Sequence, residues 1–402
     1  MRTLVKIGEK AKMAAFRAQL AWKGRRGAVA AAIARAEQKA GGPPRTGLAS
    51  RDAGRRDPNR VRVAAVQMRL RLVTSGAQFA EEIYGLARRA AEQGAELVVF
   101  PEYSGVPFLG LLPGLARLPE DTTIDQAIAA LTGDNAGGNG SGGNSRDDAS
   151  NNATDSGSVD NDGVPISAYF RAIAPGAQPA YEAAFSEVAR RLGIYVVTGS
   201  IVVPDHECTV NKAYFFGPDG QLLGTQHKTH LVPEEERWRL TPGGELNLFE
   251  TPWGKIAMPV CMDATYFETF RIAALNRADI IIIPSANQEK YVYGRANRGI
   301  WPRVQETDVY GIGSSVVGRF MGLTFSGRSA VIAPLEMTPG RDGFIARAAS
   351  PEEPEIVVGD LDLEALRRFR AENPLFVNRE LYRRYLPALY EEARRRRERP
   401  YQ

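Results

Sequence analysis

The chain has 402 residues, 44% of them hydrophobic, which is enough for a substantial core in one large domain or two ordinary ones. Its formal net charge is only +4, but residues 1–60 carry 15 Lys/Arg against 4 Asp/Glu, so the remainder of the chain is acidic. With two cysteines we expect no disulfide framework, and because the sequence lacks a long apolar run we expect neither a membrane-spanning helix nor a secretory signal. We therefore expect a cytoplasmic protein.

Residues 1–60 are predicted to form a basic helical arm followed by a linker. Apolar side chains between Leu4 and Trp22 form a rough stripe among lysines and arginines, which predicts one or two helices in residues 1–40. Residues 41–60 are rich in Pro, Gly and Arg, a composition typical of a linker. We expect the stripe to pack on the protein itself or on a second copy, with contact to a membrane surface or to nucleic acid as the alternative.

Alternating strands and helices are predicted over residues 61–365. A strand over Val61–Met68 is followed by an amphipathic helix over Gln78–Gln93, capped by Ser75, and by a buried strand over Leu97–Phe100. The later elements are a helix over residues 181–192 and strands over residues 194–203, 213–216, 221–226, 255–260, 280–283, 310–317, 330–333 and 356–361. Because no second linker interrupts the series, we expect one layered α/β domain, followed by a tail over residues 366–402.

Residues 132–163 break this pattern. They consist almost entirely of Gly, Asn, Ser and Asp, and Val159 is their only sizeable apolar residue. Such a segment cannot bury enough surface to offset the entropy of ordering, so we predict a disordered insertion. Its Asp and Asn residues lack the ordered spacing of a calcium-binding loop.

Cys261 is the strongest candidate for a nucleophile. It follows the predicted strand over residues 255–260 and precedes Met262 and Asp263, so its sulfur can be exposed beside backbone N–H groups. Most unpaired cysteines are inert core residues, and Cys208, which lacks such a setting, is expected to be one of them.

Other chemistries and partners find less support. His227 and His230 flank Lys228 and could pair with a cysteine, but they are a thin basis for a metal site. No Gly-x-Ser-x-Gly elbow lies between a predicted strand and a predicted helix, which argues against a serine hydrolase. The body is acidic and has no recognised nucleic-acid-binding module, so no nucleic acid partner is expected.

Three short segments, in this order and in these local contexts, resemble the nitrilase superfamily of carbon–nitrogen hydrolases, in its amidase-like branch. The segments are Val98–Tyr103 around Glu102, His227–Leu231 around Lys228, and Pro259–Asp263 around Cys261. Three supporting segments also resemble the family, namely Asn211–Gly220, Pro242–Gly243 and Asp279–Asn287. One motif alone would be weak, but the ordered set is specific, and the resemblance covers about residues 61–365.

The resemblance implies a catalytic role for each central residue. Cys261 would be the nucleophile and Glu102 the general base, while Lys228 and the backbone N–H of Met262 would stabilise the oxyanion. No metal or organic cofactor is expected for this chemistry.

The family also uses a second glutamate, located between the lysine and the Pro-Gly pair. Glu236 is predicted to be this residue from its offset to Pro242, with Glu234 and Glu235 as the alternatives. The second glutamate would orient Lys228 or the nitrogen atom of the substrate.

The resemblance further implies a four-layer α-β-β-α sandwich and a homodimer or larger homo-oligomer, to which residues 367–399 could contribute. The expected substrate is a small amide or N-carbamoyl compound (a ureide), because Asp263 stands where nitrile hydrolases of the family usually have Glu. Nitrile hydrolysis and N-acyl transfer by the same residues are the enzymatic alternatives. An inactive binding protein on a hydrolase fold is the non-enzymatic alternative.

Overall fold

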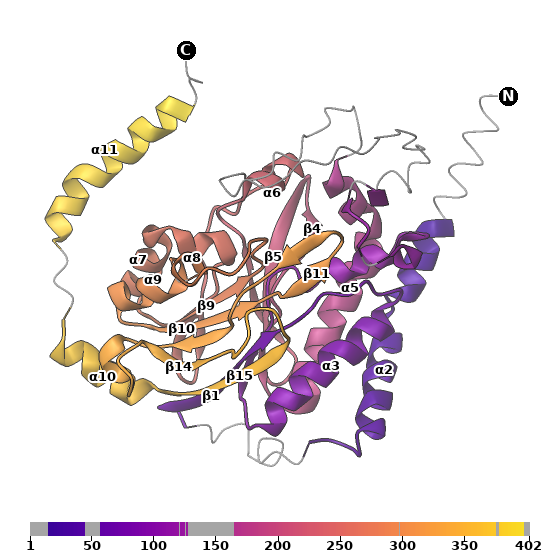
Figure 1. The fold of residues 1–402 in the computed structure, drawn as a ribbon, viewed down its shortest axis with the longest axis horizontal. Coiled ribbons are helices and arrows are strands. Elements are labelled where there is room, and N and C mark those ends of the chain that lie inside the picture. Colours follow the sequence, from indigo (N-terminus) through magenta and orange to yellow (C-terminus); the bar gives the residue numbers. More distant parts are fainter. Residues whose placement is uncertain are drawn as a thin grey trace, which may run out of the picture.

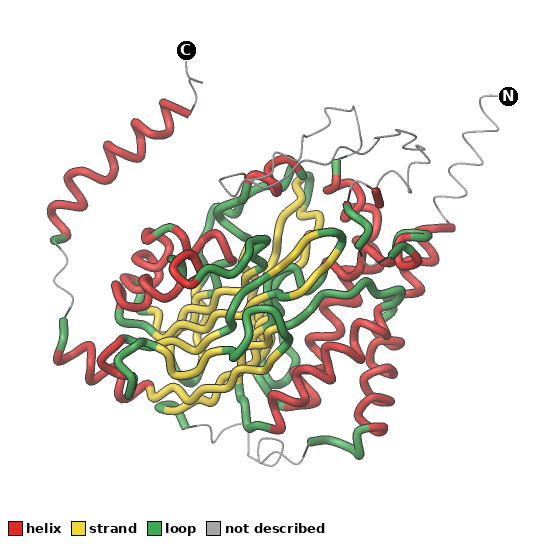
Figure 2. The backbone as a smooth tube through the Cα atoms, viewed as in Figure 1, coloured by secondary structure: helices red, strands yellow, loops and turns green. Residues whose placement is uncertain are grey.

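The computed structural model describes residues 15–44, residues 57–127 except 120 and 125, residues 165–296, residues 298–374 and residues 378–397. The predicted insertion at residues 132–163 and the beginning of the arm lie outside the described residues. Two large β-sheets form the centre of the molecule, and helices lie on their outer sides (Figure 1 and Figure 2).

The first sheet contains seven strands. Its order is β15 (Glu355–Asp362), β1 (Arg60–Gln67), β2 (Leu97–Val99), β3 (Tyr195–Val197), β5 (Cys208–Phe216) and β4 (Ile201–Asp205), and β5 also pairs with β6 (Leu222–His227). Strands β1, β2 and β3 are parallel, whereas the other pairs are antiparallel. Val99 lies between Ala65 and Val197 in the register, so the segments that follow these parallel strands leave the sheet at the same edge.

The second sheet contains six strands. Its order is β14 (Phe344–Arg347), β13 (Ala330–Ile332), β10 (Tyr310–Ser315), β9 (Ala278–Ser285), β8 (Gly254–Ala257) and β7 (Leu248–Thr251). Strands β10, β9 and β8 are parallel, and the outer pairs are antiparallel. A separate antiparallel pair consists of β11 (Gly318–Phe320) and β12 (Leu323–Phe325).

The two sheets face one another across a shared apolar core. Val63 of β1 lies in that core with Ile282 of β9, whereas Ala64 lies in a second core beneath the helices of the first sheet. Ile281 lies in a third core, beneath the helices of the second sheet. Both faces of each sheet are therefore buried, which is why the strands read as nearly continuous apolar runs. The layers follow the order helix–sheet–sheet–helix, the sandwich that the family resemblance implies.

Helices form the two outer layers. On the first sheet lie α3 (Gly76–Glu92) and α5 (Ile166–Leu192), with α2 (Arg26–Lys39) packed on both; on the second sheet lie α7 (Phe267–Leu275) and α9 (Ile300–Thr307). The other helices are α6 (Pro233–Arg237), α8 (Tyr293–Ala296), α10 (Leu363–Glu372) and α11 (Arg379–Arg397), and the 3-10 helices are η1 (Val106–Leu111), η2 (Leu115–Arg117), η3 (Cys261–Thr265) and η4 (Leu335–Met337). Within the described ranges, no helix has the length and apolar character needed to cross a membrane.

Two predicted elements differ from the structure. The helix predicted over residues 181–192 is only the second half of α5, because Pro175 and Pro179 lie inside the helix and conceal its first half in the sequence pattern. The strand predicted over residues 194–203 is divided into β3 and β4, because Gly199 adopts a positive φ of 75° and turns the chain between them.

The described part of the arm packs on the first helical layer. Leu20, Val29 and Ile33 are buried in the core that also contains α3 and α5. The backbone of the arm approaches the backbone of α5 closely at Gly24 and Gly176, since a Cβ atom on Gly24 would stand 2.1 Å from the carbonyl oxygen of Gly176. The arm therefore uses its apolar face to cover the body.

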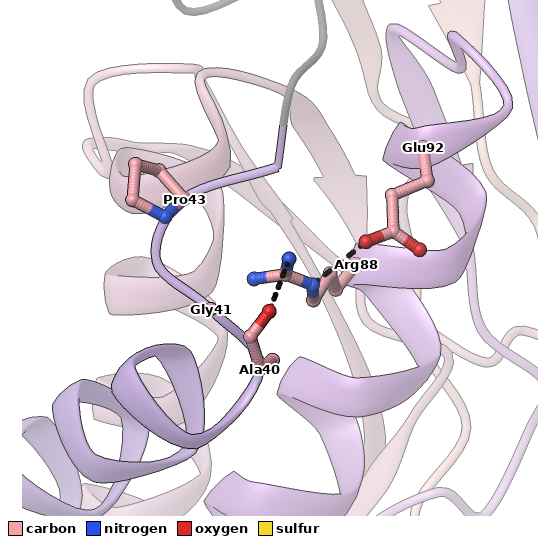
Figure 3. Close-up of a pocket in the computed structure, with 5 residues that line it drawn as sticks. All are labelled: Ala40, Gly41, Pro43, Arg88 and Glu92. Carbon is pink, nitrogen blue, oxygen red and sulfur yellow. Dashed lines mark hydrogen bonds and ion pairs between the residues drawn. The ribbon is translucent and has the colours of Figure 1, made fainter.

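Arg88 of α3 fastens the end of α2. Its guanidinium group donates to the carbonyl oxygens of Ala40, at 3.1 Å, and Gly42, and it pairs with Glu92 at 2.8 Å (Figure 3). These groups border a surface cavity of about 330 Å³, also lined by Gly41 and Pro43. The N–H groups of Arg88 already have acceptors within the protein and are not left to bind a ligand. We therefore attribute this cavity to the packing of the arm on α3.

The C-terminal helix α11 lies apart from the sheet layers (Figure 1). Its apolar side chains are about half exposed, and they are Leu381, Tyr382, Tyr385, Leu389 and Tyr390. The hydroxyl group of Tyr390 contacts the carboxylate of Glu268 on α7.

Candidate active site

Glu102 lies in the turn that follows β2. The backbone N–H of Phe100 donates to the carbonyl oxygen of Val197 at 2.9 Å, which extends the pairing of β2 with β3 to the turn. The turn also depends on Gly199, because a Cβ atom there would stand 1.8 Å from the carbonyl oxygen of Pro101. The Glu102 residue is 1% exposed, so its carboxylate is buried at the edge of the first sheet.

Lys228 follows β6 and reaches the same place. Its backbone N–H donates to the carbonyl oxygen of Asn211 on β5 at 2.9 Å, which fixes the chain at the end of the strand. Its Nζ lies 2.8 Å from Oε1 of Glu102 and 2.7 Å from Oε2 of Glu235, and its side chain is also 1% exposed. One buried ammonium group therefore lies between two buried carboxylates.

The structure places Glu235, rather than the predicted Glu236, beside Lys228. Glu235 is fully buried, Glu236 is exposed, and Glu234 forms an ion pair with Arg237 on the surface at 2.9 Å. Successive side chains of a helix such as α6 point about 100° apart, so only one of three consecutive glutamates can face the interior. The prediction of Glu236 used only the sequence distance to the Pro-Gly pair and took no account of the helical phase. It was wrong for this reason.

A local signal for Glu235 does exist in the sequence. Pro233 is suited to the first position of a helix, and Glu235 then occupies the third position. In the structure, Oε2 of Glu235 accepts a hydrogen bond from the backbone N–H of Val232 at 3.0 Å, as a glutamate does at that position. The helix-start pattern therefore distinguishes Glu235 from its two neighbours.

Asn211 and Tyr103 complete the buried cluster, and the sequence analysis assigned neither of them to the site. Asn211 Nδ2 donates to Oε1 of Glu102 and to Oε1 of Glu235, both at 3.0 Å. The hydroxyl group of Tyr103 donates to the same oxygen of Glu235 at 2.6 Å. Asn211 opens a segment that resembles the family and Tyr103 adjoins Glu102, but their contacts arise only in the tertiary structure.

Cys261 lies at the tight turn that begins η3. Its φ of 47° is in the left-handed region, where a residue with a side chain is strained, a feature that often marks functional turns. Its Sγ lies 3.9 Å from Oδ1 of Asn287, and the charges of Glu102 and Lys228 both shift the pKa of its thiol. Met262 follows in the first turn of η3, so its backbone N–H lies at the start of that helix.

Asp263 joins the cysteine turn to the lysine segment. Its fully buried carboxylate accepts the backbone N–H groups of Val260 at 2.8 Å, His230 at 2.7 Å and Thr229 at 3.1 Å. It also accepts the hydroxyl group of Thr229 at 2.8 Å and lies 3.0 Å from Nδ1 of His230. These bonds fix the positions of the segments that carry Lys228 and the thiol relative to each other.

Burial dominates the electrostatics of the cluster. It raises the pKa of the Cys261 thiol far above its ordinary value; Glu102 raises this pKa further, and Lys228 lowers it. Burial also raises the pKa of Glu102, where Lys228 opposes the rise and Glu235 adds to it. Burial lowers the pKa of Lys228, but its anionic neighbours outweigh this effect and raise it above the ordinary value. At neutral pH the cysteine is therefore a thiol that needs a base, and the lysine is an ammonium ion.

The remaining candidates from the sequence lie outside the cluster. Nε2 of His227 lies 3.7 Å from Oδ2 of Asp205, and burial lowers the pKa of His227. Cys208 is exposed at the start of β5, so its predicted place in the core was wrong. Its carbonyl oxygen accepts a hydrogen bond from Arg171 at 2.8 Å.

The fold is an α/β sandwich, and its buried cluster brings two carboxylates and an ammonium group to the neighbourhood of the Cys261 thiol. The chain belongs to the carbon–nitrogen hydrolase family, because the family model matches residues 62–371. The resemblance predicted from three short segments is thereby confirmed.

Individual relatives match parts of the chain. It is 32% identical over 196 residues to the probable hydrolase YhcX of Bacillus subtilis, a match that covers 47% of this chain and 38% of that protein. It is 32% identical over 201 residues to the omega-amidase NIT2 of Danio rerio, which covers 47% of this chain and 69% of that protein. The chain therefore spans well under half the length of YhcX and about two thirds of that of NIT2.

A solved structure shows the same fold. An amidase mutant from Nesterenkonia sp. AN1 aligns with a TM-score of 0.52 and 19% identity, covering 81% of this chain and 96% of that one. In that amidase, the acetamide moiety of fluoroacetamide is covalently added at the active-site cysteine.

Proposed function

We propose that the protein hydrolyses the carbon–nitrogen bond of a small amide or N-carbamoyl compound through a thioester on Cys261. The observation that carries the proposal is the buried cluster of Glu102, Lys228 and Glu235 beside the thiol. The similarity to an omega-amidase and to an amidase with a modified cysteine supports an amide substrate.

In the acylation step, Glu102 accepts the proton of the Cys261 thiol while the sulfur attacks the carbonyl carbon of the substrate. The negative charge that develops on the carbonyl oxygen is stabilised by the Lys228 ammonium group and the backbone N–H of Met262. When the carbon–nitrogen bond breaks, Glu102 returns its proton to the leaving nitrogen, which departs as ammonia or an amine.

In the deacylation step, water attacks the thioester. Glu102 accepts a proton from the water molecule and returns it to the sulfur of Cys261 as the carbon–sulfur bond breaks. The products are a carboxylic or carbamic acid and the regenerated thiol. A base with a raised pKa suits this work, because it holds the accepted proton more strongly until the proton passes to the leaving group.

Glu235 takes the orienting role that the sequence analysis gave to Glu236. Its Oε2 lies 2.7 Å from Nζ of Lys228, so it holds the ammonium group and offsets its charge in the buried site. Without such partners, a buried ammonium ion would be strongly destabilising.

The proposal is tested with a panel of short amides, ω-amides, N-carbamoyl compounds and nitriles, scored by ammonia release. For each active substrate, acid quenching during turnover followed by mass spectrometry should find the acyl group on the peptide that contains Cys261. Turnover without any adduct on that peptide, together with activity that survives the loss of the thiol, would contradict the thioester mechanism.

The same panel separates the alternatives. A nitrile hydrolase would release ammonia from nitriles and not from amides, and an N-acyltransferase would need an amine acceptor before the thioester turns over. An inactive binding protein would form no adduct with any substrate, although it would fold and expose the same thiol.

We also propose that the protein is a homo-oligomer. Phe267, Ile272 and Leu275 of α7 are 47–55% exposed, as are most apolar side chains of α11, and such a large apolar surface is rarely left uncovered. Sedimentation of the full chain should give a dimer or larger, and removal of residues 378–402 should weaken the association. A full chain that stays monomeric at every concentration would contradict this proposal.

A further inference from the structure

The carboxylate of Glu235 is saturated with hydrogen-bond donors. Its Oε1 accepts from the hydroxyl group of Tyr103 at 2.6 Å and from Nδ2 of Asn211 at 3.0 Å. Its Oε2 faces Nζ of Lys228 at 2.7 Å and accepts from the backbone N–H of Val232 at 3.0 Å. A carboxylate offers about four acceptor positions, so these contacts leave none for a substrate or a thiol proton.

Glu102 is bonded differently, although it lies in the same cluster. Its Oε1 accepts hydrogen bonds from Lys228 at 2.8 Å and from Asn211 at 3.0 Å. Its carboxyl group also interacts with the Cys261 thiol. One carboxylate can therefore accept a proton, while the other is fully engaged.

Tyr103 is built into the site as a donor. Its backbone has a φ of 59° and its N–H donates to Oγ of Ser200 at 3.0 Å, which fixes the residue directly after Glu102. Its ring lies 6.0 Å from Nζ of Lys228 and packs against Trp238 with ring centres 6.2 Å apart. Burial, together with the charges of Glu102 and Glu235, raises the pKa of Tyr103 well above its ordinary value, so the phenol keeps its proton.

We propose that Tyr103 is a positioning residue that holds Glu235 as the fixed counter-anion of Lys228 and so leaves proton transfer to Glu102 alone. This inference rests on the proposed function. Tyr103 does not touch the reacting atoms; it acts through Glu235 on the placement of the ammonium group that meets the oxyanion.

The test compares two reactions of the same thiol in Tyr103→Phe. Hydrolysis of an amide develops an oxyanion and needs Lys228 in place, so kcat should fall about tenfold while KM changes less than about twofold. Alkylation of Cys261 by iodoacetamide displaces iodide from carbon and develops no oxyanion, so its rate should fall much less than kcat. A merely structural defect would lower both rates together.

Tyr310→Phe is the matched control. Tyr310 is also buried, and its hydroxyl group donates to the carbonyl oxygen of Asp362 at 2.8 Å. Its loss should lower the melting temperature to a similar extent and leave both rates unchanged. If Tyr103→Phe behaves like this control, or if its alkylation rate falls in parallel with kcat, the proposed role of Tyr103 is overturned.

A second variant keeps the test independent of the fold of Tyr103→Phe. Glu235→Gln and the double variant with Tyr103→Phe should have the same kcat, because both changes act through one contact and their effects cannot add. Additive losses would overturn the proposal. Failure of the proposed function has a different signature, because wild-type hydrolysis would then survive complete alkylation of Cys261.

Discussion

The cluster around Lys228 and the interface beneath the N-terminal arm are both buried, but opposite contacts stabilise them. The cluster buries one ammonium group between Glu102 and Glu235 and depends on short polar contacts. The arm interface buries aliphatic side chains such as Val29 and Ile33 and leaves most charged side chains in the described part of the arm in solvent. Removing one group from the cluster strands another charge in the interior, whereas removing one group from the arm interface only loses apolar area. Substitutions in the cluster are therefore expected to lower the turnover rate most, and substitutions in the arm interface to lower the melting temperature most.

The sharpest test of this contrast is Cys261→Ala. We expect hydrolysis to be abolished while the melting temperature changes little, because the thiol carries the reaction and is small. Ammonia release and thermal unfolding measure the two effects. Cys208→Ala is the matched control, since Cys208 is exposed and should tolerate the change silently. Residual hydrolysis in Cys261→Ala at the wild-type rate would refute the mechanism.

Lys228→Ala should give the next largest effect. Turnover should fall by about a thousandfold, with a much smaller rise in KM, because the ammonium group is matched to the charge of the transition state. The variant should also unfold at a lower temperature, because Glu102 and Glu235 lose their shared cation. Steady-state kinetics decide the matter, and a change confined to KM would assign Lys228 to substrate binding.

Glu235→Gln and Glu236→Gln form a matched pair within α6. The first should lower kcat about tenfold to a hundredfold, because a charged contact to Lys228 is lost. The second should stay within about twofold of the wild type, as expected of an exposed residue. Equal effects of the two substitutions would remove the distinction between the buried and the exposed glutamate.

The pH dependence of kcat/KM should expose the state of Glu102. A general base must be ionised, so activity should fall as the pH drops through the pKa of Glu102, which burial and then the charge of Glu235 raise. The acid limb should therefore lie above the ordinary range of a glutamate. In Glu235→Gln one cause of the rise is removed, and the limb should move to lower pH; a limb that stays in place would argue against Glu102 as the base.

Removing residues 1–55 should affect chemistry least. The loss of Leu20, Val29 and Ile33 from the interface costs roughly 1.5–3 kcal/mol for each buried side chain, so the melting temperature should drop by more than about 5 °C. Turnover at low temperature should persist, because the family match begins at residue 62.

The membrane alternative for the arm makes a different prediction. Arg25→Gln with Arg26→Gln removes two exposed charges of the arm and should leave the melting temperature unchanged. If the full chain sediments with anionic liposomes in a salt-sensitive way and this double variant does not, the arm contacts membranes as well as the body.

Many central strands could be predicted because they are buried on both faces, as β2 and β3 are, and therefore appear as apolar runs, whereas the four-layer order was implied by the family resemblance. The same pattern fails where the chain bends or where a helix contains proline, as at Gly199 and Pro175. Glu102, Lys228 and Cys261 each follow the end of a strand within a short motif, so all three could be predicted from the order of these motifs. The contacts of Tyr103 and Asn211 could not be predicted, because they join segments that meet only after the chain has folded.

The close approach of Gly24 and Gly176 means that a single added methyl group could detach the arm from the body. A single methyl group at Gly24 would stand 2.1 Å from a carbonyl oxygen, so Gly24→Ala should detach the arm without shortening the chain or altering its charge. This full-length variant with an undocked arm would distinguish effects that need the arm to pack on the body from effects that need only its sequence and charge. The crossing also sets a size limit for natural variation, because at this position even alanine is too large.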